Sequence, residues 1–142
     1  MKTTKTNSLA KTLFLFGMVV MMAFSMNSCT KKIPFLISSV LPAAEGQVVV
    51  KTDKNNNYVI QVEVSNLADV SRLQPPKNSY VVWIETERGQ ARNIGSIVSS
   101  KNLKASFETV SSFKPNRIFI TAEENESSQY PGPMVVLTTN RF

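Results

Sequence analysis

Hydrophobic and polar residues alternate along much of the chain after residue 46, and this period of two predicts β-strands. Residues 58–65 give the clearest case, because one face of the segment is polar and the other carries Tyr58, Ile60, Val62 and Val64. Polar and Gly- or Pro-containing stretches separate this segment from its neighbours, as turns and loops do. Further strands are predicted at residues 47–52, 79–86, 91–98, 104–110, 117–123 and 134–139.

The segment 79–86 departs from simple alternation because both of its faces are apolar. Tyr80 leads one face, and Trp83 lies on the other. Such a strand is expected at the centre of a sheet with cover on each side, or against a partner. Trp83 therefore has two interpretations: an exposed aromatic edge for a protein or glycan, or a buried side chain, which we favour. A lone tryptophan on a middle strand is similar to the core tryptophan of immunoglobulin domains.

Two segments have less regular patterns. Residues 66–78 place Leu67, Val70 and Leu73 at helical spacing, which predicts at most one helical turn before the Pro75-Pro76 pair ends it. Residues 33–40 fit either a tether or a first strand, and the pattern does not decide between them. The mature chain is thus predicted to be all-β, an immunoglobulin-like antiparallel β-sandwich of about seven strands spanning residues 46–142.

The first 28 residues have a different character, which predicts a cleaved signal peptide. Three lysines precede a mostly apolar run at residues 12–24. That run would be only ~20 Å long as a helix, shorter than the ~30 Å hydrocarbon core of a bilayer. A basic start, a short apolar run and small residues afterwards are typical of a secretory signal.

The only cysteine of the chain, Cys29, directly follows this segment. Ser28 supplies the small residue that precedes the acylated cysteine in a bacterial lipobox, and the site resembles one. Met26 stands where leucine is usual, and Asn27 departs from the usual small residue. We expect Cys29 to carry lipid and residues 29–45 to form a lipidated tether. Stable anchoring needs more than one acyl chain, which a triacylated cysteine provides.

Two further features bear on where the protein goes. Thr30 follows the cysteine in place of the aspartate associated with inner-membrane retention, which favours the outer membrane. The alternative is cleavage at Ala23-Phe24-Ser25, which would release a soluble secreted protein with a free thiol.

Composition narrows the function further. The chain has no histidine and one cysteine, which excludes Ser-His-Asp and Cys-His catalysis and most transition-metal sites. The net charge of +6 falls to +3 without residues 1–28, because 13 basic and 10 acidic side chains remain. No dense basic stripe is left, so we expect no nucleic-acid function and predict no cofactor.

Four short motifs occur in order along residues 58–138: Tyr80-Val81-Val82-Trp83-Ile84, Asn93-Ile94-Gly95, a strand ending at Glu123, and Pro131-Gly132-Pro133. Their series resembles the extracytoplasmic domain of anti-sigma-K-type regulators. The resemblance implies an immunoglobulin-like sandwich outside the cytoplasm. It does not carry over anti-sigma activity, which in that family belongs to a separate cytoplasmic domain. It singles out Tyr80, Trp83, Gly95 and Glu123 as structural or interaction residues.

Acidic residues offer the remaining candidate chemistry. Glu123, Glu124 and Glu126 would suit a hard cation such as Ca²⁺, although a solvated acidic loop is the simpler interpretation. A carboxylate-only enzyme would need two paired acids, and nothing in the sequence pairs the strand residues Glu63, Glu85, Glu108 and Glu123.

The sequence therefore favours a lipid-anchored extracytoplasmic module with a non-enzymatic binding or structural role. Its partners would be the membrane, through the lipid, and an envelope protein. A sensor related to anti-sigma ectodomains is the alternative. The sequence does not identify a small-molecule ligand.

Overall fold

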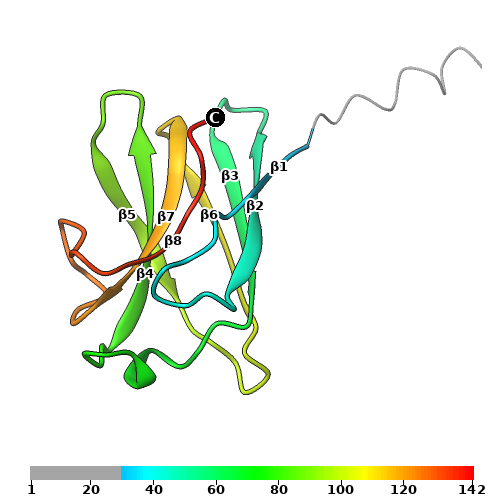
Figure 1. The fold of residues 1–142 in the computed structure, drawn as a ribbon. Coiled ribbons are helices and arrows are strands. Elements are labelled where there is room, and N and C mark those ends of the chain that lie inside the picture. The colour runs from blue at the N-terminus through cyan, green and yellow to red at the C-terminus, as the bar shows by residue number, and fades with distance from the viewer. Residues whose placement is uncertain (1–29) are drawn as a thin grey trace, which may run out of the picture.

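The computed structural model describes residues 30–142, and these form a β-sandwich (Figure 1). Its strands are β1 (Lys31–Pro34), β2 (Glu45–Thr52), β3 (Tyr58–Ser65), β4 (Ser79–Thr86), β5 (Ala91–Ile97), β6 (Ala105–Ser111), β7 (Pro115–Glu123) and β8 (Val135–Thr138). The strands pair antiparallel in two sheets, in the orders β1-β2-β3-β6 and β5-β4-β7-β8. The predicted all-β sandwich is confirmed, and every predicted strand is present to within a few residues.

The main core lies between the two sheets and follows from the alternation of the strands. The inward residues of β3, Ile60, Val62 and Val64, are buried, as the sequence pattern requires. The face of β4 led by Tyr80 packs against them from the other sheet. Burying one such aliphatic side chain stabilises the fold by roughly 1.5–3 kcal/mol. This core is formed entirely by residues from Ile33 to Leu137, with Phe142 at its margin.

The sandwich begins earlier than predicted, at Lys31 instead of residue 46. Residues Lys31–Pro34 pair with Gln47–Val50 of β2, and Ile33 is only 5% exposed. Of residues 33–40, for which the sequence left tether or strand open, Ile33 and Pro34 belong to this strand and Phe35 forms an isolated bridge, whereas residues 36–40 are not in a strand. The strand was hard to recognise because four residues, one of them buried, are too few to show an alternation. The chain then leaves the sheet, and Ile37 is 90% exposed.

The irregular segment between β3 and β4 contains the single predicted helical turn, a 3₁₀ helix at Val70–Arg72. The Asp69 carboxylate caps it by accepting a hydrogen bond from the Ser71 N–H at 2.9 Å. Tyr80 fastens the segment to β4, because its hydroxyl donates to the Ala68 carbonyl at 2.9 Å. Burial, with a smaller contribution from nearby Asp69, raises the pKa of Tyr80 to about 12, so this hydroxyl stays protonated as a donor.

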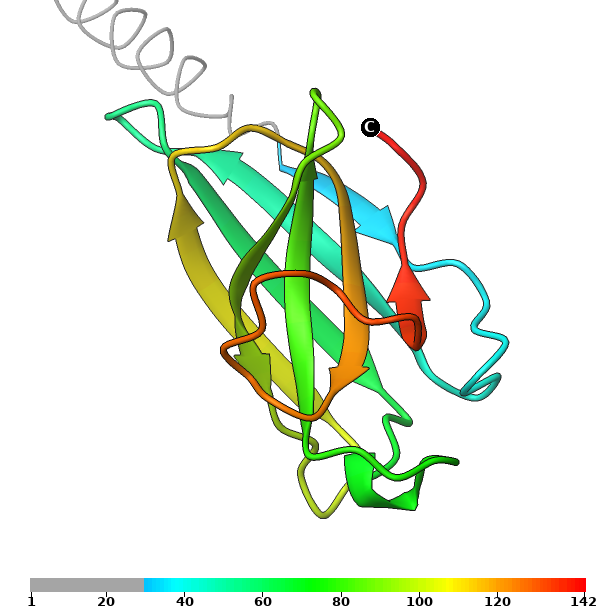
Figure 2. The same cartoon turned by 90° about the vertical axis from the view of Figure 1, so that its left-hand side faces the viewer.

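The two sides of the sandwich differ in how their edge strands are closed. On one side, β1 pairs with β2, and Phe35 then forms a bridge with Thr139, just beyond β8 of the other sheet. This crossing ties the two sheets together, as Figure 2 shows for the cyan and red segments. On the other side, β5 and β6 end their sheets without a further strand among the described residues.

Candidate functional site

Trp83 is fully buried on the outer face of the β5-β4-β7-β8 sheet. Its ring stacks on Phe119 of β7, with centroids 6.2 Å apart and planes 12° from parallel, and Val81 completes a second small core. The loop of residues 124–134 crosses this face (Figure 2). The favoured interpretation of burial under a loop is confirmed. The likeness to the immunoglobulin core tryptophan is wrong, because Trp83 points away from the core between the sheets.

A chain of hydrogen bonds connects Trp83 to the covering loop. The indole Nε1 donates to Thr121 Oγ1 at 2.8 Å, and that hydroxyl donates to Glu123 Oε1 at 2.5 Å. The Gly132 N–H, from the far end of the loop, donates to the same carboxylate oxygen at 2.6 Å. Glu123 is 8% exposed, and no cation in the described residues pairs with it. The two donors are therefore what compensates its burial.

Asn93 and Gly95 of β5 hold the middle of the same loop. The Asn93 side-chain amide donates to the backbone carbonyls of Glu126 and Ser128 at 2.8 and 3.0 Å, and its Oδ1 accepts from the Gly95 N–H at 2.9 Å. Gly95 has a φ of 139°, and a Cβ there would lie 2.7 Å from the ring of Phe107.

The residues singled out by the sequence thus have mainly structural roles. Trp83, Asn93, Gly95, Glu123 and Gly132 come from four motifs, yet each helps to close the loop over one sheet face. Tyr80 lies on the opposite face of β4 and fastens the connection to β3 instead. No local sequence pattern indicates that these motifs meet, because their contacts join residues up to 38 positions apart in the chain.

The three acids proposed for a cation do not converge. Glu123 is turned into the sheet face, Glu124 pairs with Lys77 at 2.8 Å, and Glu126 accepts from the Ser96 hydroxyl. Among residues 30–142, no three side chains of metal-ligating type come together. The cation interpretation is therefore contradicted for this loop.

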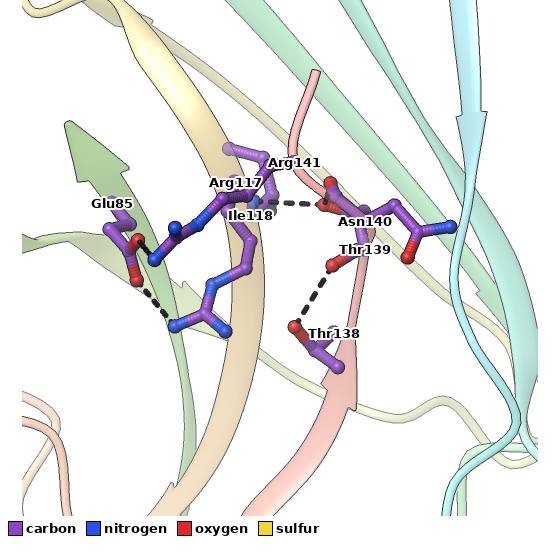
Figure 3. Close-up of polar contacts among 7 residues, drawn as sticks. All are labelled: Glu85, Arg117, Ile118, Thr138, Thr139, Asn140 and Arg141. Atoms are coloured by element: carbon purple, nitrogen blue, oxygen red, sulfur yellow. Dashed lines mark hydrogen bonds and ion pairs between the residues drawn. The ribbon is translucent and has the colours of Figure 1, made fainter. Parts of the chain in front are cut away.

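Glu85 forms the most buried ion pair among the described residues, near the other end of the same face. Its side chain is 9% exposed and contacts Arg117 and, at 2.8 Å, Arg141 (Figure 3). The Arg117 guanidinium also lies 5.2 Å from the Phe119 ring centroid, next to the second core. Figure 3 shows both arginines turned toward the one carboxylate, so Glu85 links β4 to β7 and to residue 141.

Only Glu63 and Glu108, of the four strand carboxylates, lie near each other. They occupy adjacent strands on the outer face of β1-β2-β3-β6, where Glu63 pairs in register with Ser106 and Glu108 with Gln61. They are therefore diagonal neighbours, for which a separation of about 7–8 Å between backbone positions is usual. Both are exposed, and each accepts a hydrogen bond from a glutamine side chain. Glu63 borders a hollow of about 500 Å³ that Glu108 does not line, so the two carboxylates do not share the desolvated cleft in which such a pair acts on a glycosidic bond.

A hollow lies along the open edge, between β5 and β6. Its volume is about 680 Å³, and it is bordered by Arg92, Val110, Phe113 and the loop residues 126–129. Val110 and Phe113 are 58% and 44% exposed, and the Arg92 guanidinium lies 4.1 Å from the Phe113 ring centroid. A second hollow of about 500 Å³ borders the first half of β6. The sequence does not predict the hollow between β5 and β6, because one apolar residue in a strand and one in a turn do not indicate a binding site.

Cys29, the predicted lipidation site, lies outside the described residues, as does the predicted signal peptide. Within residues 30–142, no helix is both long and apolar enough to cross a bilayer. Comparison of the chain with protein-family models and with curated protein sequences gave no match.

Proposed function

We propose that the chain is a lipid-anchored β-sandwich module of the bacterial cell envelope, which binds an envelope protein and catalyses no reaction. The observation that carries the binding role is the contrast between the two sides of the sandwich. One side is closed by the crossing of β1 to Thr139, whereas β5 and β6 leave the other open beside a hollow of about 680 Å³.

The partner's contact is an extended segment that adds to β6. An exposed edge strand offers unpaired backbone groups, and adding a strand is a recurrent way of binding peptides. β5 is less suited because a bulge at Gly95 interrupts it. β6 has no bulge, pairs regularly with β3, and has a hollow beside each half. Val110 and Phe113 supply apolar contacts near its end.

Site-specific photo-crosslinking in the native envelope tests this contact. A photoreactive residue at Val110 is expected to give one adduct, identified by mass spectrometry. Val98, 82% exposed and just beyond β5, is the matched control and should not give that adduct. Val110→Lys should then abolish co-purification of the identified partner, and Val98→Lys should not. Equal adducts from both positions, or binding that tolerates Val110→Lys, would reject the β6 site.

The anchor is tested separately at Cys29. Cys29→Ala should move the protein from the membrane fraction to the soluble fraction, and mass spectrometry of the wild type should find an acylated Cys29 at the N-terminus. A variant that stays in the membrane fraction would contradict the anchor. An N-terminus just after Ser25 would support the soluble secreted alternative instead.

A second candidate is an accessory sensor related to anti-sigma ectodomains. It is favoured by the meeting of Trp83, Asn93, Glu123 and Gly132 in one hydrogen-bonded arrangement, since these residues come from the motifs that carry the resemblance. Co-purification with a membrane anti-sigma protein would support this role. Repeated purification without such a protein, under conditions that retain the β6 partner, would count against it.

A further inference from the structure

The distance from the predicted lipid to the sandwich is very short. β1 begins at Lys31, so one residue, Thr30, separates it from Cys29. An extended chain spans at most about 3.6 Å per residue, which limits the Cα atoms of Cys29 and Lys31 to a separation of about 7 Å. This step rests on the proposed lipidation of Cys29. With it, the first strand begins at the membrane surface without an intervening tether.

The start of β1 shares one end of the sandwich with three turns, and we call it the β1 end. Lys31 pairs with Val50, close to the β2–β3 turn at residues 53–57. The β6–β7 turn at 112–114 and the β4–β5 turn at 87–90 adjoin each other, because Lys114 contacts Glu87 at 2.5 Å. Figure 1 shows all three turns and the C-terminus on the same side of the molecule, at the top.

Charge is distributed unequally between this end and the opposite one. We divide the sandwich at the row Lys32–Val49–Gln61–Glu108 in one sheet and at Ile84 in the other, and count these rows with the β1 end. Within residues 30–142, the β1 end carries nine basic and four acidic side chains, a net of +5. The other end carries four basic and six acidic side chains, a net of −2.

Ion pairs account for only part of the basic charge at the β1 end. Lys114 is paired with Glu87, and Arg117 and Arg141 share Glu85. Six exposed basic side chains at this end have no ion pair within the described part of the chain: Lys31, Lys32, Lys51, Lys54, Arg88 and Arg92. Only two acidic side chains at the β1 end, Asp53 and Glu108, have no ion pair within the described residues. The surplus positive charge is therefore exposed and not neutralised by the protein itself.

We propose that the β1 end lies directly on anionic lipid headgroups. The first strand starts about 7 Å from the anchored residue, which is within the ~8 Å Debye length of physiological salt, so screening leaves the attraction effective. Basic clusters of this size beside a membrane anchor are suited to anionic lipid. The acidic end faces away from the membrane, and the β6 edge runs between the two ends and remains accessible.

Vesicle co-sedimentation with residues 30–142, which contain the whole core and no lipid, tests this docking. The probes are vesicles of phosphatidylcholine with and without phosphatidylglycerol, at low and physiological salt. The test variant is Lys32→Gln with Lys51→Gln and Lys54→Gln. The matched control is Arg72→Gln with Lys101→Gln and Lys104→Gln, which removes the same charge from exposed, unpaired positions at the other end. Urea unfolding verifies that all three proteins are folded.

The wild-type domain should bind only the phosphatidylglycerol vesicles, and more weakly as salt increases. The β1-end variant should lose roughly a hundredfold in binding at low salt, from the usual contribution of a basic residue near an anionic surface, and the control much less. Absence of wild-type binding, or equal losses in both variants, would overturn the proposal. Binding to polyglutamate but not to vesicles would do so too, and would indicate an acidic protein. Because the domain carries no lipid, these results are independent of the Cys29→Ala test.

Discussion

The outer faces of the two sheets contrast sharply. On β5-β4-β7-β8, the loop of residues 124–134 covers Trp83 and Phe119, which are 0% and 5% exposed. On β1-β2-β3-β6, exposed glutamates accept hydrogen bonds from Gln47 and Gln61, and that face carries charged residues in contact with solvent. The first face behaves as a second, smaller core, and the second as an ordinary surface.

The difference shows how a sandwich of this size enlarges its apolar core without a third sheet. A loop can cover a sheet only if its own polar groups find partners. Here Asn93 and Glu123 provide those partners from the sheet itself. The apolar character of both faces of β4 is thus a consequence of polar residues placed on β5 and β7.

Removing the largest side chain of the covered face should have the largest effect. Trp83→Ala is expected to lower the free energy of unfolding by about 3–5 kcal/mol, because it leaves a cavity and removes the indole N–H that donates to the Thr121 hydroxyl. Urea unfolding measures the change. Domains of this size are typically stable by about 5–15 kcal/mol, so the variant should be close to unfolding at ambient temperature. A loss below about 1 kcal/mol would mean that this face is not a core.

The carboxylate that fastens the loop should come next. Glu123→Ala leaves the Thr121 hydroxyl and the Gly132 N–H without their acceptor and should cost about 2–3 kcal/mol. Glu123→Gln keeps an acceptor oxygen and should cost clearly less. Hydrogen exchange of the Gly132 amide should become faster in the alanine variant. Equal losses in both variants would show that charge, and not hydrogen-bond acceptance, is what matters.

Tyr80 lies on the opposite face of β4, so a substitution there should lower the stability of the fold without opening the loop of residues 124–134. Tyr80→Phe should cost about 1 kcal/mol near neutral pH by removing the hydrogen bond to Ala68. Because the folded-state pKa of about 12 exceeds the usual value of 10, the unfolded chain ionises first, and stability falls as pH rises between these values. The variant should lack this component in alkaline unfolding curves. Exchange in the covering loop should stay unchanged.

The open face should respond least. Gln61→Ala and Glu108→Ala each break one exposed side-chain contact and should change stability by no more than about 0.5 kcal/mol. The same urea measurements apply. A loss above about 1 kcal/mol in either variant would show that the contrast between the two faces is overstated.

Local patterns predicted most of the strands. The alternation of residues 58–65 gave both β3 and the face that it buries, and apolar residues on both faces of 79–86 correctly indicated that β4 is covered. The turn at Val70–Arg72 was likewise visible from spacing and from the prolines that follow. Each of these features depends on residues that are close together in sequence.

Features that depend on distant contacts were not predictable. The pattern of the acidic loop predicts solvent-exposed side chains, although Glu123 is buried and accepts hydrogen bonds from Thr121 and Gly132. Residues 31–34 looked like a tether because their partner strand, not their own pattern, makes them β. The hollow beside β6 needed the relative position of two edge strands, which no local pattern contains.

The crossing of β1 between the sheets also has a mechanical consequence. β1 pairs with β2, and the N–H of Leu36 then bonds the Thr138 carbonyl at 2.8 Å, in the other sheet. Strand hydrogen bonds lie across the strand, so a pull along β1 from Cys29 loads them together in shear. Tension on the proposed lipid anchor would therefore be shared by both layers of the domain, and would not peel away a single edge.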